Sequence, residues 1–286
     1  MINVLVVQIQ YSHYLGDIKE LTMAPTTMTM THINDLLILL RKTKSTSLSE
    51  LRRKVSKQVW RRVIMDQHYN FKRNIELAVM IHTKQQEDQE RQDRWTIVRE
   101  HYDKNCDVSE IEEIFKINNI DCKEFASCVK NILQEKHFKI NALRIWGVPN
   151  SGKSLIVRLI TEKFYTYYGT NTGSMSEFFY GAMVNKSLIV IEELWIVPSN
   201  VDDFKTIFSG YSIDINQKHV TERQRLLRTP LFITSNHEKH GKGHLSMMDE
   251  EAINRRMYNF KFVHLFEPKN KITCNQMYTF LIKYTD

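Results

Sequence analysis

The chain has 286 residues, of which 42% are apolar and 26% charged, and its 40 Lys and Arg outnumber its 33 Asp and Glu to give a formal net charge of +7. This composition excludes a chain that is disordered throughout, and nine Gly and five Pro are too few for a fibrous protein. No run of about eighteen apolar residues, no basic leader and no C-x-x-C pair occurs, so we expect no membrane span, no secretory signal, no structural zinc and a reducing compartment.

Little periodicity is present from residue 1 to about residue 30, which predicts a loop or a disordered arm. Next, Ser47 and Glu50 have the spacing of a helix-capping box. Apolar residues then recur at every fourth position, which predicts one amphipathic helix: Leu51, Val55, Val59 and Val63. The polar stretch 84–94 predicts an exposed helix or a connector.

Positive charge is concentrated between Arg41 and Arg62. This window holds nine Lys and Arg and a single acid, Glu50, so the remaining sequence is close to neutral. A local surplus of this size favours a polyanionic partner or a nuclear-import signal. The alternative is a solvated helix face with no partner.

A pair of helices is predicted before residue 140. Ser109 and Glu112 can open the first helix, whose buried stripe is Ile111, Ile114, Phe115 and Ile117. Asn118 and Asn119 end it. The second helix is expected over 122–136, with Phe125, Val129, Ile132 and Leu133 facing inward.

Apolar runs then alternate with helical stretches. The runs are 143–146, 187–193 and 230–236, and helices are expected to begin at Lys153 and at about Val201. This alternation predicts an α/β domain with a mostly parallel sheet.

Residues 147–154, GVPNSGKS, match the phosphate-loop pattern G-x-x-x-x-G-K-[ST] between a predicted strand and a predicted helix. Its glycines let the backbone curl so that N–H groups point at phosphates, Lys153 neutralises the terminal phosphates, and the Ser154 hydroxyl helps to hold Mg²⁺. The predicted nucleotide-binding residues are Gly147, Val148, Pro149, Asn150, Ser151, Gly152, Lys153 and Ser154. The alternative is a Gly-rich turn that happens to contain a lysine.

Polar side chains end the next two apolar runs. Glu192 and Glu193 follow a run that would be a buried strand, and we expect Glu192 in the Mg²⁺ shell and Glu193 to orient and deprotonate the attacking water. Either carboxylate could instead cap the following segment. Asn236 ends the third run, where its amide could contact the γ-phosphate and the water, although T-S-N also fits a plain turn.

With these elements the chain resembles the superfamily 3 helicases of small DNA viruses, above all the large non-structural replication protein of parvoviruses and densoviruses. The matching segments, between about residues 108 and 266, are 147–154, 188–194, 213–219, 230–236 and 252–262. The resemblance implies an AAA+-like P-loop core over 141–286 and a helical oligomerisation subdomain over 100–140. Residues 1–95 would form a partly disordered region with a basic helix and no intact nickase motif.

The resemblance also implies partners and roles. Such proteins form rings, usually hexamers, with ATP between subunits, so Arg256, or else Arg255, would reach the neighbour's γ-phosphate. A hairpin at 213–219 would contact single- and double-stranded DNA through Lys218 and His219. The family usually has a second lysine where this chain has Val220, and His219, Arg223 and Arg225 are the residues that can take its place. Translocation from 3′ to 5′ and residence in the host nucleus are further implications.

The amino-terminal third departs from the family, because no H-x-H motif occurs and we interpret the Y-x-x-K at Tyr69 and Lys72 as coincidence. We therefore expect a truncated, short-form or degenerate member that acts as an ATP-dependent DNA helicase in viral genome replication and does not nick DNA. One alternative is an inactive or endogenised viral fragment that binds DNA and partners. The other is a cellular AAA+-type ATPase that acts on protein.

Overall fold

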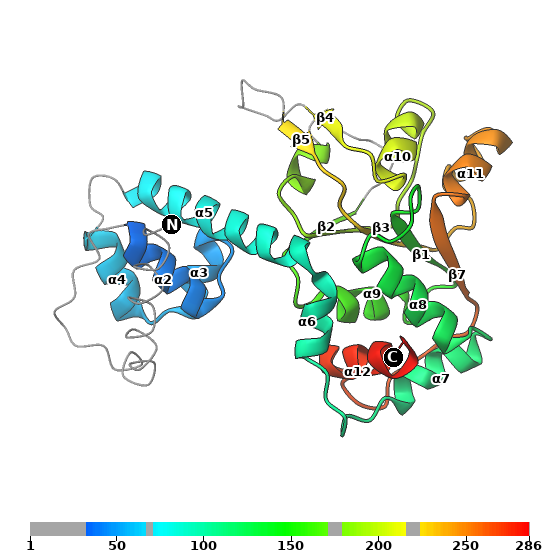
Figure 1. The fold of residues 1–286 in the computed structure, drawn as a ribbon, viewed down its shortest axis with the longest axis horizontal. Coiled ribbons are helices and arrows are strands. Elements are labelled where there is room, and N and C mark those ends of the chain that lie inside the picture. The colour runs from blue at the N-terminus through cyan, green and yellow to red at the C-terminus, as the bar shows by residue number, and fades with distance from the viewer. Residues whose placement is uncertain (1–32, 67–70, 171–178, 216–223, 286) are drawn as a thin grey trace, which may run out of the picture. The chain divides into compact units, whose positions relative to one another are not determined.

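The computed structural model describes residues 33–66, 71–170, 179–215 and 224–285. The chain divides into two compact units, Met1–His82 and Thr83–Asp286, and each is described by itself (Figure 1). The functional regions expected at 1–95, 100–140 and 141–286 concern roles, which compactness does not decide, so they stay predictions.

The first unit is helical. Its elements are α2 (Ile33–Thr43), α3 (Leu48–Lys54), α4 (Lys57–Asp66) and the beginning of α5 (Phe71–Gln92). Their apolar faces meet in one small core: Leu36, Leu37, Leu40, Leu51, Val63, Ile75 and Ala78. Because a short helix is marginal alone in water, this shared core is what holds the four segments together.

The capping box is confirmed, whereas the single helix predicted over its continuation is wrong. The Ser47 hydroxyl accepts from the backbone N–H of Glu50 at 3.2 Å, and the Glu50 carboxylate accepts from the N–H of Thr46 at 2.9 Å. The helix ends at Val55, which has an extended backbone (φ −96°, ψ 154°), and a new one begins after Ser56. The Ser56 hydroxyl accepts from the N–H of Val59 at 3.3 Å, so it caps α4 and competes with helix continuation.

The basic window lies on the surface of this unit. Eight of its nine cationic residues are exposed and Arg62 is half-buried: Arg41, Lys42, Lys44, Arg52, Arg53, Lys54, Lys57, Arg61 and Arg62. Several occupy the last turns of α2 and α3, where a positive charge also complements the helix dipole. Residues 33–82 hold eleven Lys and Arg against four Asp and Glu, so the net positive charge of the chain resides here.

The second unit contains a five-stranded sheet in the order β2-β3-β6-β1-β7, and every neighbouring pair is parallel. Its strands are β1 (Ala142–Gly147), β2 (Thr166–Thr170), β3 (Leu188–Glu192), β6 (Leu231–Ser235) and β7 (Met257–Phe262). The α/β class and the three predicted strands are confirmed. The apolar runs did not indicate the edge strands β2 and β7, because each has polar residues at its half-exposed positions.

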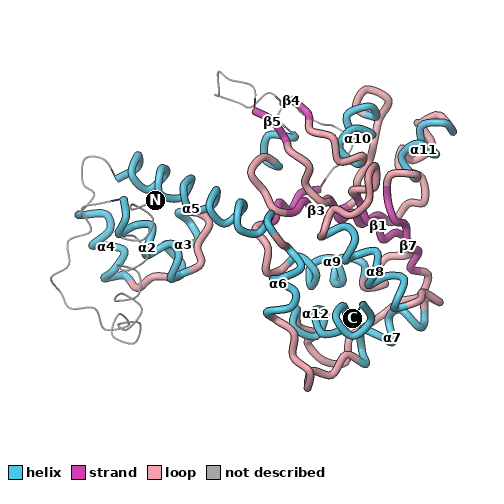
Figure 2. The backbone as a smooth tube through the Cα atoms, in the orientation of Figure 1, coloured by secondary structure: helices cyan, strands magenta, loops and turns pink. Residues whose placement is uncertain are grey.

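Helices cover both faces of this sheet (Figures 1 and 2). One face packs on α6 (Arg94–Glu100), α7 (Ser109–Ile117), α8 (Cys122–Leu133), α9 (Lys153–Thr161) and α12 (Cys274–Thr285). The other packs on the 3₁₀ turn η2 (Phe179–Met183), α10 (Val201–Phe208), α11 (Met247–Asn254) and the hairpin of β4 (Ile213–Ile215) and β5 (Gln224–Leu226). Side chains alternate between these cores along the central strands β3 and β6. None of the described helices combines the length and apolarity that a bilayer span requires.

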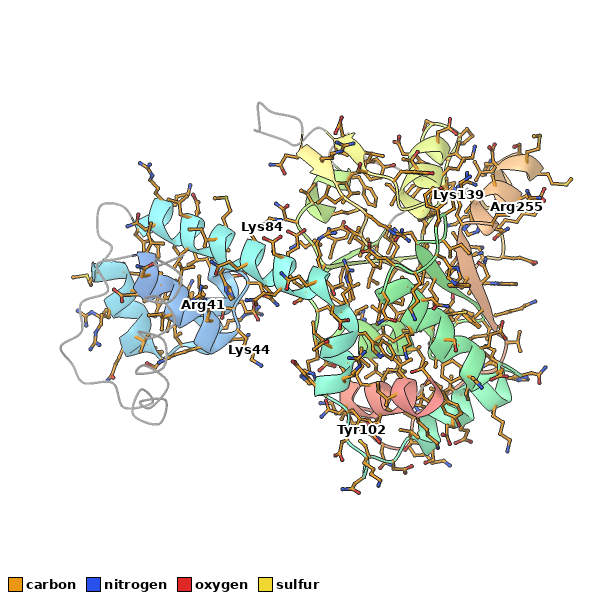
Figure 3. All side chains as sticks on the ribbon, in the orientation of Figure 1. Arg41, Lys44, Lys84, Tyr102, Lys139 and Arg255 are labelled. Atoms are coloured by element: carbon orange, nitrogen blue, oxygen red, sulfur yellow. The ribbon has the colours of Figure 1, made fainter. Side chains whose placement is uncertain are left out.

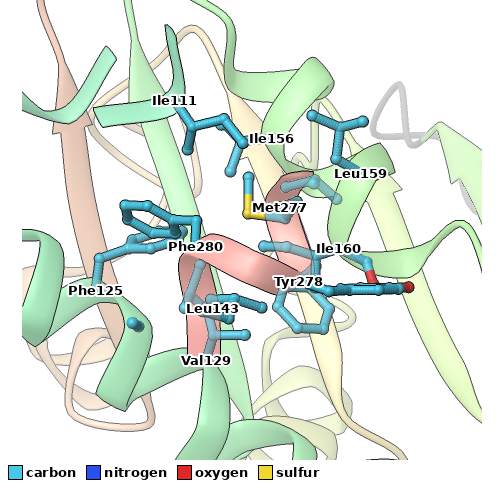
Figure 4. Packing of buried hydrophobic residues seen from close by; sticks show 14 of the residues in the cluster. Ile111, Phe125, Val129, Leu143, Ile156, Leu159, Ile160, Met277, Tyr278 and Phe280 are labelled. Atoms are coloured by element: carbon cyan, nitrogen blue, oxygen red, sulfur yellow. The ribbon is translucent and has the colours of Figure 1, made fainter. Parts of the chain in front are cut away.

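The predicted helix pair is confirmed as α7 and α8, with small differences at the ends. The predicted capping by Ser109 is wrong, because Ser109 is the first residue of α7 and its hydroxyl donates to the Asp107 carboxylate. Ile117 is only half-buried, and α8 ends at Leu133. The pair shares its core with the sheet and α12 (Figure 4). Phe115 lies at the centre of that core, with ring centroids 4.4 Å from Phe125 and 5.1 Å from Phe280.

The stretch predicted as an exposed helix or connector is helical and has six exposed residues, but three of its charged side chains are buried. Glu87, Glu90 and Arg94 are buried, and Arg91 donates to the carbonyl of Arg228 at 2.6 Å. Glu90 accepts from the N–H of Tyr165 at 2.9 Å, although burial raises the pKa of this carboxyl. Backbone groups at the amino ends of the strands need hydrogen-bond partners, and long charged side chains reach them there. The polar composition therefore reflects this packing.

We expect Phe115→Ala to lower the free energy of unfolding by about 3 to 5 kcal/mol, because it removes a fully buried ring between three aromatic neighbours. Urea unfolding followed by tryptophan fluorescence measures this. Tyr102→Ala, at a ring that is 43% exposed, is the matched control and should change stability by less than about 0.5 kcal/mol. Equal effects of the two variants would contradict the central place of Phe115.

Candidate functional site

The phosphate-loop sequence connects β1 to α9 with a backbone that requires glycine. Gly147 has φ 137° and Gly152 has φ 88°, both in the region that favours glycine. A Cβ atom on Gly147 would lie 1.8 Å from the carbonyl oxygen of Phe262, so the loop passes directly across β7. The N–H of Val148 donates to that same oxygen at 3.0 Å, and the carbonyl of Asn150 accepts from Phe266 at 3.0 Å. The loop is therefore fixed at both ends.

The Lys153 ammonium is buried inside this loop. Its Nζ donates to the carbonyl of Val148 at 2.5 Å, to that of Gly147 at 3.1 Å and to the Ser151 hydroxyl at 3.4 Å. Burial lowers the pKa of Lys153, and the charge of Glu193 opposes this shift. In the described part of the chain no side chain caps the start of α9. A buried cation beside the amino end of a helix is an environment that binds phosphate.

The two predicted acids follow different paths from the end of β3. Glu192 lies in register with Thr234 of β6, and its carboxylate pairs with Arg158 of α9 at 3.1 Å. Glu193 has a left-handed backbone (φ 52°), and its N–H donates to the carbonyl of Thr234 at 2.9 Å. The sequence patterns did not indicate Arg158, because its helical position alone gives no sign of a partner on β3.

Asn236 follows the last residue of β6, where its backbone N–H donates to the Glu193 carboxylate at 3.3 Å. The structure thus brings Glu193 and Asn236 together. The charge of Glu193 also acts on Lys153. These three residues form the centre of the site.

A cavity of about 580 Å³ opens beside this centre. It is lined by Arg158, Glu162, Tyr168, Gly169, Thr170 and Glu192. These residues belong to α9 and its carboxyl end, to β2 and to the end of β3. Of the predicted site residues only Glu192 lines the cavity, and none of the loop residues 147–154 does.

The residues that could hold Mg²⁺ are Ser154, half-buried in the first turn of α9, and Glu192. Both offer oxygen, which Mg²⁺ prefers, and this ion usually takes its other ligands from phosphates and water. Within the described ranges no group of three or more His, Cys, Asp and Glu forms a self-sufficient metal site. The donor set therefore fits an ion that arrives with a nucleotide.

A buried cluster connects Asn236 to α11, and the sequence did not reveal it. Arg144 of β1 is 2% exposed and donates to the carbonyl of His237 and to that of Glu238, the latter at 2.8 Å. The Glu250 carboxylate accepts from the N–H of His240 at 3.0 Å. Burial lowers the pKa of Arg144 to about 10, and Glu250, Glu238 and Glu193 oppose this shift. The loop after Asn236 is thereby fastened to β1.

The two arginines after α11 have different surroundings. Arg256 is half-buried, donates to the Ser209 hydroxyl at 2.8 Å and also donates to the carbonyl of Ala252. Arg255 pairs with Glu251 and its side chain is 74% exposed (Figure 3). Of the predicted pair, Arg256 is held within its own unit and Arg255 is the more exposed.

The predicted DNA-contacting hairpin is described only at its base. Strands β4 and β5 pair antiparallel, with Ile213 opposite Leu226 and Ile215 opposite Gln224. The predicted contact residues Lys218 and His219 lie outside the described residues, as do Val220, Arg223 and Tyr69. Arg225 of β5 lies 3.7 Å from the Asp214 carboxylate of β4 and donates to the Ser212 hydroxyl at 3.0 Å.

Residues 29–286 match the model of a family described as parvovirus non-structural protein NS1. The chain is 26% identical over 151 residues to the initiator protein NS1 of Aedes albopictus densovirus (isolate Boublik/1994), which covers 53% of this chain and 19% of the relative. It is 30% identical over 125 residues to the initiator protein NS1 of Aedes densonucleosis virus (strain GKV 002 002), and this alignment covers 44% of this chain and 15% of that relative. The chain thus spans less than a fifth of these curated relatives.

Among solved structures, the X-ray structure of JCV helicase is similar in fold. The match covers 83% of this chain and 78% of that chain, with a TM-score of 0.51 and 11% sequence identity. At this identity the similarity concerns the fold alone.

We expect stability to fall on acidification through His240. Burial, and next the charge of Arg144, lower the pKa of His240 from 6.5 to about 3. Between these values the unfolded state binds a proton that the folded state does not, so stability is lost as the pH falls below 6.5. Relative to a His240→Gln variant, the wild-type chain should lose about 2 kcal/mol between pH 6.5 and 5.

Urea unfolding of both proteins at pH 8, 6.5 and 5 measures this difference. Glutamine keeps a polar side chain near Asn254 and does not titrate, so it separates His240 from the other acids and bases that change with pH. Stability curves that stay parallel across this range would show that His240 is not the group responsible.

Proposed function

Because this chain belongs to the parvovirus non-structural protein NS1 family, whose model it matches over residues 29–286, we propose that it is an ATP-dependent DNA helicase that acts in replication of a small single-stranded DNA virus genome. The observation that carries the proposal is the meeting of three groups at the carboxyl edge of the sheet: the buried Lys153 ammonium, the Glu193 carboxylate and the end of β6 at Asn236. Their residue types and order are those of a nucleotide-hydrolysing phosphate loop.

The nucleotide would be ATP, bound by the loop 147–152 and by Lys153. Phosphate oxygens would replace the neutral carbonyl and hydroxyl groups that now surround the ammonium. This exchange is favourable because a hydrogen bond between two charged groups is stronger than one to a neutral acceptor. Ser154 and Glu192 would hold Mg²⁺, which supplies positive charge at the phosphates. The Arg158–Glu192 pair is partly solvent-exposed and contributes little free energy, so Glu192 can exchange this partner at low cost.

Glu193 would orient the attacking water and accept its proton. Its carboxylate is held by the N–H of Asn236, so the base and the end of β6 keep a fixed relation. The Asn236 amide would contact the γ-phosphate and the same water. Loss of the γ-phosphate would then be sensed at β6 and at the loop that Arg144 fastens.

ATP hydrolysis would depend on assembly into a homo-oligomeric ring, which we propose to be a hexamer. Arg256 of one subunit would reach the γ-phosphate bound by its neighbour and stabilise the charge that develops there. To do so it must exchange its bond to Ser209, whereas Arg255 is already exposed and is the alternative.

Single- and double-stranded DNA would be the polymeric partners. Lys218 and His219 would contact the strand inside the ring, and movement would run from 3′ to 5′. Such backbone contacts are electrostatic and independent of sequence. The exposed basic window of the first unit supports residence in the host nucleus, because clustered Lys and Arg are typical of import signals.

A second candidate function is a non-enzymatic module that binds DNA and partners, such as an endogenised viral fragment. Two observations favour it: Glu192 pairs with Arg158, and Arg256 is bonded to Ser209, so two predicted functional side chains are engaged within one unit. The cellular ATPase alternative is not retained, because the family is viral.

An ATPase assay with and without single-stranded DNA separates the two candidates. We expect DNA-stimulated turnover in the parent protein and a loss of about 100-fold or more in Glu193→Gln, which removes the base but keeps nucleotide binding. Lys153→Ala should weaken nucleotide binding as well. Lys163→Ala, which removes a lysine beyond the end of α9, is the control. A parent protein that binds ATP without any turnover would favour the non-enzymatic module.

Arg256→Ala should lower turnover about 1,000-fold and leave nucleotide binding intact, because its guanidinium would serve the neighbouring site. Mixing it with Lys153→Ala subunits tests this role directly. One subunit then offers an intact nucleotide site and the other an intact arginine, so mixed rings should regain part of the activity. Ser209→Ala, which removes only the bond to Arg256, is the control for local structure. If Arg256→Ala mixed with Lys153→Ala regains no ATPase activity, whereas Arg255→Ala mixed with Lys153→Ala does, the role belongs to Arg255.

A further inference from the structure

The loop between α8 and β1 presents four consecutive exposed residues, Lys136, His137, Phe138 and Lys139. The Phe138 side chain is 72% exposed, which is unusual for a phenylalanine. Glu135 and Lys139 have positive φ angles of 51° and 70°, so the loop turns sharply at both of its ends. Neither the phosphate site nor the hairpin uses these residues.

A second exposed aromatic ring meets Phe138 from a different part of the chain. Tyr211, which lies between α10 and β4, is 46% exposed. Its ring centroid is 5.8 Å from that of Phe138, and the two planes are at 90°. Two loops that are far apart in sequence thus place their aromatic rings together at the surface. We call Phe138 and Tyr211 the aromatic pair.

Arg228 holds both loops in place. Its Nη2 donates to the carbonyl of His137 at 2.8 Å, and its Nε donates to the side-chain carbonyl of Asn141 at 3.2 Å. On the other side, Gly210 has φ 74°, and a Cβ atom there would lie 2.8 Å from Arg228 Nε. The residue before Tyr211 therefore packs directly on the guanidinium. This support fixes the aromatic pair while it stays exposed.

Positive charge surrounds the aromatic pair. Lys139 places its ammonium 6.0 Å from the centre of the Phe138 ring, and Lys136 is exposed in the same loop. The nearby acids are paired with arginines: Glu135 pairs with Arg94 at 2.8 Å and lies 3.6 Å from Arg228, and Asp214 lies 3.7 Å from Arg225 of the same surface. Because Arg225 belongs to β5 and Tyr211 precedes β4, this surface adjoins the base of the predicted DNA hairpin.

We propose that the aromatic pair and Lys136, Lys139 and Arg225 form a binding site for single-stranded DNA, in which bases stack on the rings and phosphates contact the cations. Exposed aromatic rings interspersed with basic side chains are the usual means of binding single strands without sequence preference. A duplex does not offer unstacked bases to such rings, so the site selects single strands. The inference rests on the proposed helicase function and adds a contact outside the hairpin tip.

Anisotropy of a labelled thymidine oligonucleotide, compared with an abasic strand of the same length, tests the stacking. Both are titrated with the 286-residue chain in the absence of nucleotide. Phe138→Ala should bind the thymidine strand about tenfold more weakly and the abasic strand unchanged. Phe138→Trp should retain tight binding. Tyr102→Ala is the control, because the exposed fraction of Tyr102 is similar to that of Tyr211. Tyr102 lies at the opposite end of the unit from Lys139 (Figure 3).

The lysines should act through phosphate instead. Lys136→Gln and Lys139→Gln are expected to weaken both strands alike and to lower the slope of log affinity against log salt by about 0.7 per contact. Salt slopes that stay unchanged in both variants would remove the lysines from the site.

Four other outcomes would overturn the proposal. Equal losses on both strands in Phe138→Ala would mean a structural role, and a changed mass by light scattering would mean a contact with a second copy of the chain. Unchanged binding would mean no role for the ring, while ATPase and strand binding by the parent protein would leave the helicase proposal intact. A parent protein that binds no thymidine strand would contradict DNA binding altogether, and with it both this proposal and the helicase proposal.

Discussion

The site depends on one buried charge, the Lys153 ammonium enclosed by the carbonyls of Gly147 and Val148. Removing a cation from water is unfavourable unless polar groups or an anion replace the lost hydration, and neutral carbonyls do so only in part. The lowered pKa of Lys153 reflects this burial. Because Lys153 is already desolvated in the folded loop, an arriving phosphate would meet a cation that is already positioned. The parallel register of β3, β6 and β1 then determines which side chains lie beside that cation.

Buried and half-buried arginines fix the loops at both edges of the sheet. Arg144 satisfies carbonyls of the loop after β6, while Arg91 and Arg228 satisfy carbonyls at the opposite edge. A guanidinium carries five N–H donors in a planar fork, so a single side chain can hold several turns of irregular backbone. The arrangement has a cost, since no described atom accepts from Arg144 Nε or from Arg94 Nη2. Rigid loops are obtained at the expense of incompletely paired buried donors.

Local patterns were sufficient for the central strands, the helix pair and the phosphate loop, because apolar periodicity and glycine positions act over a few residues. They failed where the decisive contact joins distant segments. The burial of Glu90 depends on Tyr165, and the surroundings of Glu192 depend on Arg158. A four-residue apolar repeat also continued across Val55 although the Ser56 hydroxyl ends the helix there. Sequence patterns placed Glu193 and Asn236 at the same edge, but only the coordinates show the bond between them.

The end of α10 connects the nucleotide side of the unit to its predicted DNA side. Arg256 donates to the Ser209 hydroxyl, and its carbonyl shares the N–H of Asn141 with that of Phe208, at 3.3 and 3.0 Å. Gly210 and Tyr211 follow Ser209 directly, and Asn141 accepts from Arg228 below the aromatic pair. In the proposed ring, Arg256 would have to leave Ser209 in order to reach a neighbouring subunit. That exchange would act on the turn that carries Tyr211, so under this proposal hydrolysis in one subunit would be connected to the surface proposed to bind a strand.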